Sequence, residues 1–294
     1  MIDDVKINLD ASVILALNLI IAFNMFIVSL SLRLQHFKQV AKTPKSVAVG
    51  LFSQFILLPF FSFLFTLFVP MHPSVALALI MVASCPGGNL SNVFTFLAKG
   101  NLALSVSLTA VGFPIAMIAT PLNFGFYASM HPEVSKLVAA VGLDPVKFIA
   151  AIFFNMLIPL VLGCYVGSTF TRFYNAVAPY TARFALISIL TIVLIAIKDN
   201  LGILEQFGNQ YVGVAIAHNL VVLLVGYLTA RLFFLPTQDK RSITIETGIQ
   251  NCPLGTVLIL TFMPTLGGAV ITITFWGAWQ ILSTWMLSSY WKNR

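Results

Sequence analysis

The chain has 294 residues, of which 59% are hydrophobic and only 9% are charged. Soluble domains carry roughly a quarter charged residues, so this composition excludes a globular fold with a water-exposed surface. The net charge of +7 does not indicate a nucleic-acid partner. Its basic residues lie in short loops between apolar segments, where they set the orientation of a membrane protein.

Apolar segments of about 20 residues, the length of a membrane-crossing helix, recur along the whole chain. They predict an all-α polytopic membrane protein with about nine transmembrane helices. We place these helices at 11–32, 46–69, 74–98, 101–126, 146–170, 178–198, 209–235, 241–265 and 268–291. The polar residues before the first helix lack a basic region, so we expect that helix to be retained and not cleaved as a signal peptide.

The Lys and Arg residues are distributed unequally between the two sides of these helices. Four of the sixteen lie on the side of the N-terminus, namely Lys6, Lys136, Lys147 and Lys198. The other twelve are Arg33, Lys38, Lys42, Lys45, Lys99, Arg172, Arg183, Arg231, Lys240, Arg241, Lys292 and Arg294. The positive-inside rule then places the N-terminus outside and the C-terminus in the cytoplasm. We expect an integral protein of a plasma membrane or a bacterial inner membrane.

Two of the predicted helices are interrupted. The third contains Ser-Cys-Pro-Gly-Gly-Asn at 84–89, and the eighth contains Asn-Cys-Pro-Leu-Gly at 251–255. Proline removes a backbone donor and clashes with the preceding turn, so each helix is expected to unwind there, although a simple proline kink is the alternative for either break alone. The breaks lie five helices apart, in helices of opposite direction, which predicts inverted repeats with two broken crossing helices.

Glu246 is the acidic residue that lies inside a predicted helix, about a turn and a half before the second break. A carboxylate at this depth costs about 3 kcal/mol or more on insertion scales. No Lys or Arg is placed at the same depth, so we expect a bound cation or a proton to neutralise it. The alternative is a carboxylate near the inner interface that pairs with Lys240 or Arg241.

Neutral oxygen donors accompany Glu246 around the two breaks. They are Gln54, Ser91, Asn92, Ser105, Thr109, Gln250 and Asn251. Amide, hydroxyl and carboxylate oxygens suit a hard cation, and a single carboxylate favours a monovalent one. For each Ser or Thr alone, a hydrogen bond within its own helix is the alternative. We assign His218 no functional role, since a lone histidine inside a membrane is more often a packing residue. Cys85, Cys164 and Cys252 lack the spacing of a metal site or disulfide framework.

The residues of both breaks resemble the crossing motifs of the bile acid:sodium symporter family. The resemblance is carried by Cys-Pro-Gly-Gly-Asn-Leu-Ser-Asn at 85–92 and by Glu-Thr-Gly-Ile-Gln-Asn at 246–251, and it extends over the whole chain in order and spacing. It implies one transporter domain over 1–294 with two parts. The panel comprises the helices at 11–32, 146–170 and 178–198, and the core comprises those within 46–126 and 209–291.

The same resemblance implies two sodium sites and a substrate site beside the crossing helices. The first sodium site would use Ser91, Asn92, Ser105, Thr109 and Glu246. The second would use Gln54, Glu246, Gln250 and backbone carbonyls near Thr247 and Ile249. The substrate would lie near Asn89 and Asn251. The sequence departs from the family pattern in having nine helices, where many bacterial relatives have ten, and in the Cys252-Pro253 pair of the second break.

These observations predict a secondary active transporter that couples sodium to the symport of a small organic anion by alternating access. A bile-acid-like molecule or another amphipathic carboxylate is the expected substrate, and the expected partners are sodium ions and the lipid bilayer. A proton-coupled carrier, or a sodium/proton antiporter using Glu246, is the first alternative. A non-transporting membrane sensor is the second. We expect no enzymatic activity, since the sequence has no HExxH motif and no serine motif with a plausible base.

Overall fold

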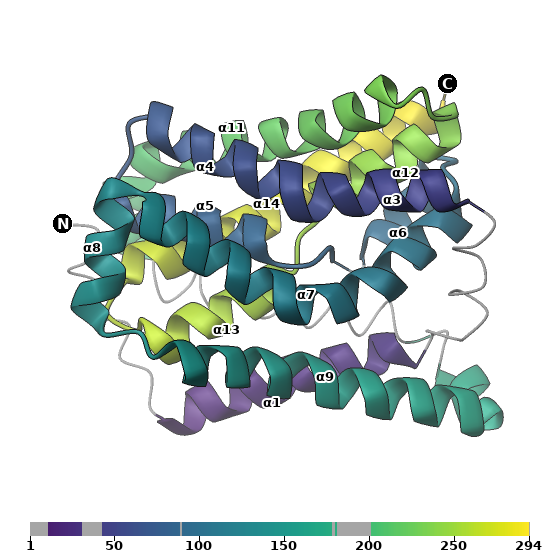
Figure 1. Cartoon of the computed structure of the whole chain (residues 1–294), viewed down its shortest axis with the longest axis horizontal. Helices are drawn as coiled ribbons and strands as arrows, with labels where there is room; N and C mark the ends of the chain where they lie inside the picture. The colour runs from purple at the N-terminus through teal and green to yellow at the C-terminus, as the bar shows by residue number, and fades with distance from the viewer. Residues whose placement is uncertain (1–10, 31–42, 89, 178–179, 181–200, 294) are drawn as a thin grey trace.

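The computed structural model describes residues 11–30, 43–88, 90–177, 180 and 201–293, and within these ranges the regular secondary structure is helical. The helices are α1 (Ala11–Ser29), α3 (Pro44–Phe52), η2 (Ser53–Leu57), α4 (Leu58–Phe68), α5 (Pro73–Ser84), α6 (Leu90–Leu97), α7 (Leu102–Met130), α8 (Pro132–Val141), α9 (Pro145–Thr169), α11 (Leu201–Leu232), α12 (Thr237–Gly248), α13 (Cys252–Phe262) and α14 (Gly267–Lys292). Figure 1 shows the longer helices side by side along the long axis of the molecule, with the short α8 crossing them at one end.

The prediction of an all-α polytopic membrane protein is confirmed. Five segments are long and apolar enough to cross a membrane, namely Pro44–Phe68, Leu102–Met130, Pro145–Thr169, Tyr211–Leu232 and Gly267–Lys292. Eight of the nine predicted spans fall on described helices, while the span at 178–198 lies almost entirely outside the described residues. The count of nine therefore stays a prediction.

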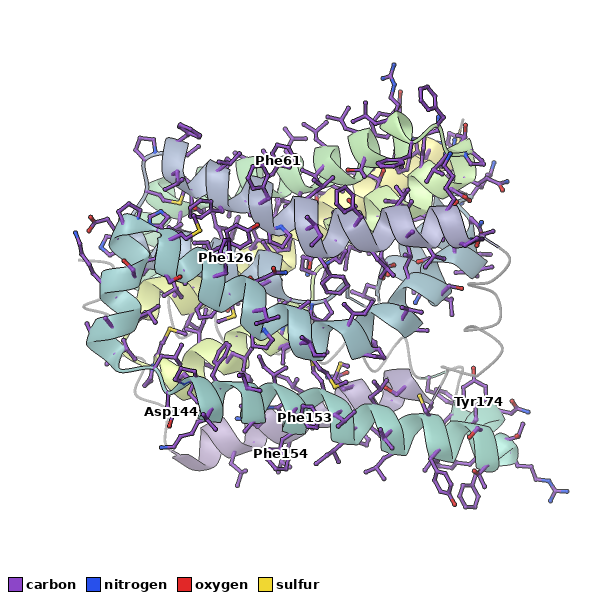
Figure 2. All side chains as sticks on the ribbon, in the orientation of Figure 1. Phe61, Phe126, Asp144, Phe153, Phe154 and Tyr174 are labelled. Atoms are coloured by element: carbon purple, nitrogen blue, oxygen red, sulfur yellow. The ribbon has the colours of Figure 1, made fainter. Side chains whose placement is uncertain are left out.

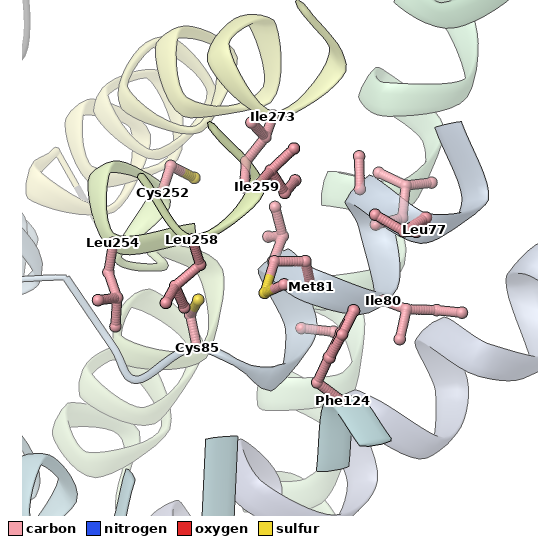
Figure 3. Packing of buried hydrophobic residues seen from close by; sticks show 14 of the residues in the cluster. Leu77, Ile80, Met81, Cys85, Phe124, Cys252, Leu254, Leu258, Ile259 and Ile273 are labelled. Carbon is pink, nitrogen blue, oxygen red and sulfur yellow. The ribbon is translucent and has the colours of Figure 1, made fainter. Parts of the chain in front are cut away.

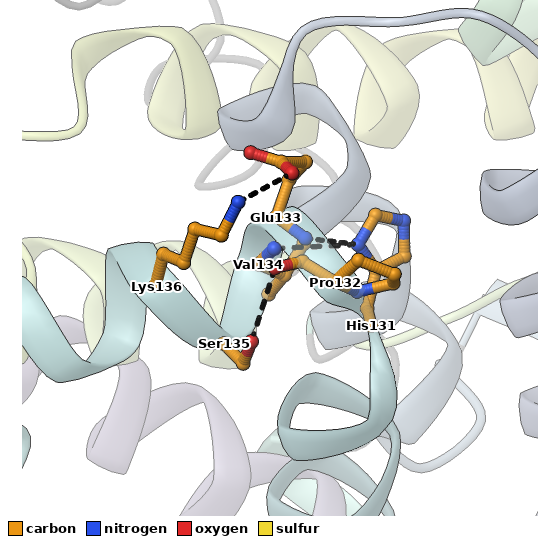
Figure 4. Close-up of polar contacts among 6 residues, drawn as sticks. All are labelled: His131, Pro132, Glu133, Val134, Ser135 and Lys136. Carbon is orange, nitrogen blue, oxygen red and sulfur yellow. Dashed lines mark hydrogen bonds and ion pairs between the residues drawn. The ribbon is translucent and has the colours of Figure 1, made fainter.

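The helix α8 was not predicted from the sequence, which placed only a loop between the spans ending at 126 and starting at 146. His131 begins this helix, because its Nδ1 accepts the backbone N–H groups of Glu133 and Val134, each at 3.3 Å (Figure 4). Gly142 ends it with a left-handed backbone, at φ 68°. A ten-residue helix with one buried residue is too short and too polar for the apolar-length criterion that located the spans.

The helices α1 and α9 form a layer of their own along one edge of the molecule (Figure 1). Gly163 and Gly167 of α9 allow the two backbones to approach closely. A Cβ atom on Gly163 would lie 2.5 Å from the carbonyl oxygen of Phe26, and one on Gly167 would overlap the carbonyl of Leu30. Small residues four apart are the usual means by which membrane helices pack at short distance.

Large apolar side chains cover much of the outer surface of the bundle. Figure 2 labels Phe61, Phe126, Phe153 and Phe154, whose exposed fractions run from 41% to 66%. In water such side chains would be a liability, but the acyl chains of a bilayer are as apolar as they are. The exposed aromatic surface therefore agrees with a protein that lies in a membrane.

The half-helices α5 and α13 lie at the centre of the bundle, enclosed by the longer helices. Every residue of α5 from Ser74 to Ser84 is buried, and Leu77 and Met81 pack in the same cluster as Leu258 of α13 (Figure 3). A helix that is apolar on all sides is stable only when it is covered on all sides. This central burial places the polar ends of both half-helices inside the protein.

His218 of α11 is a fully buried packing residue, as the sequence analysis expected. Its Nδ1 accepts the indole N–H of Trp276 at 3.0 Å, so its Nε2 carries the proton and donates to the Ser62 hydroxyl at 2.9 Å. Both ring nitrogens are thus occupied by neutral partners, and the side chain links α11 to α4 and α14.

Candidate functional site

The chain unwinds at both predicted breaks, and the two unwound segments pair with each other. Between α5 and α6 the Gly88 N–H donates to the carbonyl of Ile249 at 2.8 Å, and the Asn251 N–H donates to the carbonyl of Pro86 at 2.9 Å. Gly87 and Gln250 form an antiparallel bridge between them. Peptide groups inside a membrane must be satisfied by protein, and here each broken helix satisfies the other.

The glycines of the first break make this close approach possible. A Cβ atom on Gly88 would lie 2.8 Å from the Ile249 side chain and 3.1 Å from the carbonyl oxygen of Gln250. A Cβ atom on Gly87 would lie 2.8 Å from a carboxylate oxygen of Glu246. A larger residue at position 88 would therefore push the two unwound segments apart, and one at position 87 would displace the Glu246 carboxylate.

Glu246 lies in α12 next to the crossing, with 5% of its surface exposed. Its Oε2 accepts the Ser105 hydroxyl at 3.0 Å, and its Oε1 accepts the Thr109 hydroxyl at 2.9 Å. In the described ranges no Lys or Arg forms an ion pair with it. Arg241 instead donates to the carbonyl of Ala98 at 2.7 Å. The alternative in which Glu246 forms a salt bridge with Arg241 is therefore wrong.

The helix α6 brings further oxygen atoms toward the carboxylate. Ser91 is fully buried and lies close enough to interact with Glu246, but its hydroxyl makes no regular hydrogen bond with any described residue. The side-chain oxygen of the adjacent Asn92 is also buried and has no partner among those residues. Buried oxygens without a partner are rare and costly, and a cation that accepts them as ligands would remove that cost.

Gln54 and Gln250 form a second polar contact at the two breaks, apart from the one around Glu246. Each side-chain amide donates to the oxygen of the other, at 2.8 Å and 3.2 Å. Gln54 also donates to the carbonyl of Cys85 at 3.1 Å, and Gln250 donates to that of Thr247 at 2.7 Å. The carbonyl of Ile249 accepts the Gly88 N–H. Of the residues expected at the second sodium site, Gln54, Gln250 and Thr247 are thus hydrogen-bonded to one another, with Gln54 in the π-helical turn η2, whereas Glu246 is bonded to Ser105 and Thr109 instead.

A small cavity lies between the two predicted sets of ligands. Its volume is about 10 Å³, which is about the smallest space that holds one water molecule, and a dehydrated sodium ion is smaller still. Three polar side chains line it, those of Gln54, Thr109 and Glu246, and the rest of the lining is Pro86, three glycines and the apolar residues Leu51, Phe55, Leu108 and Phe113. The oxygens of the three polar side chains are of the kind that a small monovalent cation binds, but they occupy only part of a largely apolar wall.

A second cavity, of about 40 Å³, lies between α1 and the crossing. Ile21, Asn24 and Met25 line it from α1, and Asn251 and Gln280 line it from the core helices. Asn251 uses its Oδ1 to cap α13 at the N–H of Leu254, at 3.2 Å, which leaves its amide group near Met25. Asn89, the other residue predicted to contact substrate, lies outside the described residues.

The proline of the second break begins a helix and does not kink one. Pro253 is the second residue of α13, where the missing N–H would have no helical partner in any case. The departure from the family pattern at Cys252-Pro253 is thus compatible with the same crossing geometry.

Two residues that the sequence analysis did not assign to the site belong to this cluster. Gln280 of α14 accepts the backbone N–H of Gln250 at 2.6 Å and donates to its carbonyl at 3.0 Å, so it holds the unwound segment from behind. Thr95 of α6 donates to the Ser105 hydroxyl at 3.3 Å. Gln280 could have been noticed as an amide inside an apolar span, and Thr95 as the residue four positions after Ser91 on the same helix face.

Comparison with protein families gives one match, over residues 18–207, to the model described as the Sodium Bile acid symporter family. Among curated proteins, the "Uncharacterized sodium-dependent transporter YocS" of Bacillus subtilis is 30% identical over 270 residues, which cover 92% of this chain and 81% of that protein.

Animal and plant relatives are similar at the same level but longer. The "Sodium/bile acid cotransporter 4" of Mus musculus is 31% identical over 241 residues, which cover 80% of this chain and 53% of that protein. The "Probable sodium/metabolite cotransporter BASS1, chloroplastic" of Arabidopsis thaliana is 28% identical over 229 residues, which cover 78% of this chain and 55% of that protein. The chain thus spans about half the length of these two relatives.

Proposed function

This chain belongs to the sodium bile acid symporter family, a family of sodium-dependent membrane transporters and not of enzymes, and from this premise we propose that it couples inward movement of sodium to uptake of an organic anion. The observation that carries the proposal is the environment of Glu246. Its buried carboxylate is surrounded by hydroxyl and amide groups and adjoins a cavity of ionic size. A negative charge there requires a cation, and the neighbours supply oxygen ligands for one.

We assign two sodium ions to the two predicted ligand sets, which share Glu246. The proximity of Ser91 to Glu246 and the buried, unpaired side-chain oxygen of Asn92 support the first site. The Gln54–Gln250 pair and the small cavity support the second. Because the ligands come from α6, α7, α12 and η2, bound sodium would tie both broken helices together. It would thereby hold the crossing in the conformation that receives the substrate.

The substrate would bind in the cavity between α1 and the crossing, near Asn89 and Asn251. Half-helix N-termini carry a partial positive charge, and α13 begins at this cavity, although the N–H groups of Cys252 and Leu254 in its first turn already have partners within the protein. At about 40 Å³ the cavity has room for an anionic head group but not for the body of an amphipathic carboxylate, so α1 would have to move away from the crossing to admit the whole substrate. A bile-acid-like molecule is one example of an amphipathic carboxylate.

Transport would proceed by alternating access, with the core moving against the panel. The separate α1–α9 layer supports a panel that also contains the span predicted at 178–198. With the N-terminus outside, each sodium ion that enters down a potential of 100 mV gains about 2.3 kcal/mol. Two such ions would drive a monovalent anion inward with one net positive charge moved.

Thermal unfolding of the purified protein in sodium, potassium and choline chloride tests the sodium sites. Sodium at about 100 times its dissociation constant stabilises a one-site protein by about 2.7 kcal/mol, so we expect sodium alone to raise the Tm by about 5 °C or more. Glu246→Gln should abolish this response, and Glu133→Gln, an exposed carboxylate on α8, should retain it. A wild-type protein that responds to pH but not to sodium would identify the proton-coupled alternative.

The organic anion requires a second assay, in which uptake into vesicles is measured with and without a sodium gradient. A panel of bile acids, keto acids and other amphipathic carboxylates should include a substrate whose uptake depends on inward sodium and moves positive charge. Sodium-dependent stabilisation without uptake of any anion would favour the non-transporting sensor.

A further inference from the structure

An open groove runs between α11, α12 and α14, on the face of the molecule opposite to α1 and α9 (Figure 1). Its volume is about 730 Å³. A second groove of about 530 Å³ adjoins it, and Lys240 lines both. Neither groove includes a residue of the crossing or of α1, so this surface is separate from the proposed sodium and substrate sites.

One wall of the larger groove is apolar and faces the membrane. Leu220, Leu224 and Met286 line it with exposed fractions of 58%, 45% and 55%. Trp279 and Tyr290 lie along the same wall. Trp and Tyr are typical of the membrane–water boundary, where the ring is apolar and its polar atom reaches the head groups.

The other end of the groove is basic. Lys240 and Arg241 of α12 line it, and Arg231 in the last turn of α11 lines the adjoining groove. The described residues that line the two grooves include no acidic side chain. Asp239 lies in the same turn of α12, directly before Lys240, but its oxygens accept hydrogen bonds from Ser46 at 2.6 Å and Asn101 at 2.8 Å. Its charge is therefore directed away from the groove.

The Arg241 guanidinium is held in a fixed position at this end. One of its Nη atoms donates to the carbonyl of Ala98 at 2.7 Å, and its Cζ lies 5.8 Å from the ring centroid of Trp291. Its buried Nε has no hydrogen-bond partner among the described residues. Across the same ranges, no ion pair joins Arg231, Lys240 or Arg241 to a carboxylate, so the three charges are available to an anion from outside the chain.

We infer that this groove binds an anionic phospholipid, with its acyl chains along the Leu220, Leu224 and Met286 wall and its phosphate between Lys240, Arg241 and Arg231. An apolar channel that ends in unpaired cations complements such a lipid in both shape and charge. In the proposed topology the basic end faces the cytoplasmic leaflet, where anionic lipids concentrate and attract Lys and Arg. A zwitterionic lipid would match the apolar wall but not the basic end.

Competitive lipid binding to the purified full chain tests this inference. The protein is incubated with equal amounts of phosphatidylglycerol and phosphatidylcholine that carry the same acyl chains, and retained lipid is counted by native mass spectrometry. We expect a preference for phosphatidylglycerol of about tenfold, and its loss in the Arg231→Gln/Lys240→Gln variant, since each basic residue near an anionic head group adds several-fold to affinity. Arg241 is left unchanged because it also donates a hydrogen bond to the carbonyl of Ala98, and its substitution could disturb the fold.

The matched control is the Lys147→Gln/Arg172→Gln variant, which removes two exposed charges that line neither groove, and it should keep the preference. Equal retention of the two lipids by the wild-type protein would overturn the inference without any variant. Unchanged preference in the Arg231/Lys240 variant would overturn it too. So would displacement of phosphatidylglycerol by soluble glycerol phosphate at a similar concentration, because the site would then recognise a free anion and not a lipid.

Discussion

The crossing and the α1–α9 layer are held together in opposite ways. At the crossing, the two backbones are unwound and are held by polar side chains from other segments, including Gln54 of η2 and Gln280 of α14. In the α1–α9 layer, two intact helices pack at short distance over Gly163 and Gly167, with the Asn18–Asn155 amide pair at 3.0 Å beside them. Polar contacts can exchange partners or accept an ion, whereas a close-packed helix pair has one arrangement.

This contrast separates the part of the molecule that we propose binds sodium from the part that we expect to serve as a rigid support. Substitutions at the crossing should alter the response to sodium, whether or not they also alter stability without sodium. Substitutions between α1 and α9 should lower stability equally in both conditions. The predictions below test that distinction, beginning with the largest expected effect.

Glu246→Gln should lower sodium affinity, and with it sodium-driven uptake, by about 100-fold or more. Attraction between opposite charges about 4 Å apart in a protein is worth about 4 kcal/mol, and the amide retains the shape of the side chain without its charge. Without sodium the variant should be as stable as the wild-type protein, or more stable, since a buried unpaired charge is removed. Sodium titrations followed by thermal unfolding measure both quantities, and unchanged affinity would contradict the proposed sites.

Gly167→Ala should destabilise the protein by about 3 kcal/mol, because overpacking costs about 1–3 kcal/mol and the added Cβ meets the backbone of Leu30. The loss in Tm should be the same with and without sodium. Gly125→Ala is the control, since that position has open space around it. A Gly167→Ala variant that loses its sodium response while keeping its Tm would show that the layer is not merely a support.

Gln280→Ala should lower sodium affinity by about tenfold and stability without sodium by about 2 kcal/mol. The backbone N–H and carbonyl of Gln250 would lose their partner, and a buried polar group without one costs about 1–3 kcal/mol. Leu282→Ala, an exposed position on the same helix, should change neither. If the variant lost the same stability at every sodium concentration, Gln280 would contribute to stability alone and not to sodium binding.

Thr95→Val should have the smallest effect, a loss of sodium affinity of about threefold. The hydroxyl of Thr95 contacts Ser105 and not Glu246, so its removal would only loosen the orientation of one proposed ligand. A single hydrogen bond of this kind contributes about 1 kcal/mol. Isothermal titration with sodium would measure the affinity of the variant. A loss of affinity as large as that of Glu246→Gln would mean that Thr95 is itself a sodium ligand.

The sequence by itself determined the class of the fold and most of the proposed site. Apolar length located eight helices, proline and glycine located the two breaks, and the cost of a buried carboxylate singled out Glu246. These signals are local. They depend on how a few neighbouring residues behave in a membrane, and so they can be interpreted without knowing what lies beside them.

Only the tertiary structure decided which segments lie beside one another. The pairing of Gly88 with Ile249, the contact of Gln280 with Gln250, and the fit of Gly167 against Leu30 all join residues distant along the chain. An amide in an apolar helix can face lipid, a neighbouring helix or a broken backbone, and its type does not distinguish these. Contacts of this kind follow from the packing of all the helices together, which no short segment encodes.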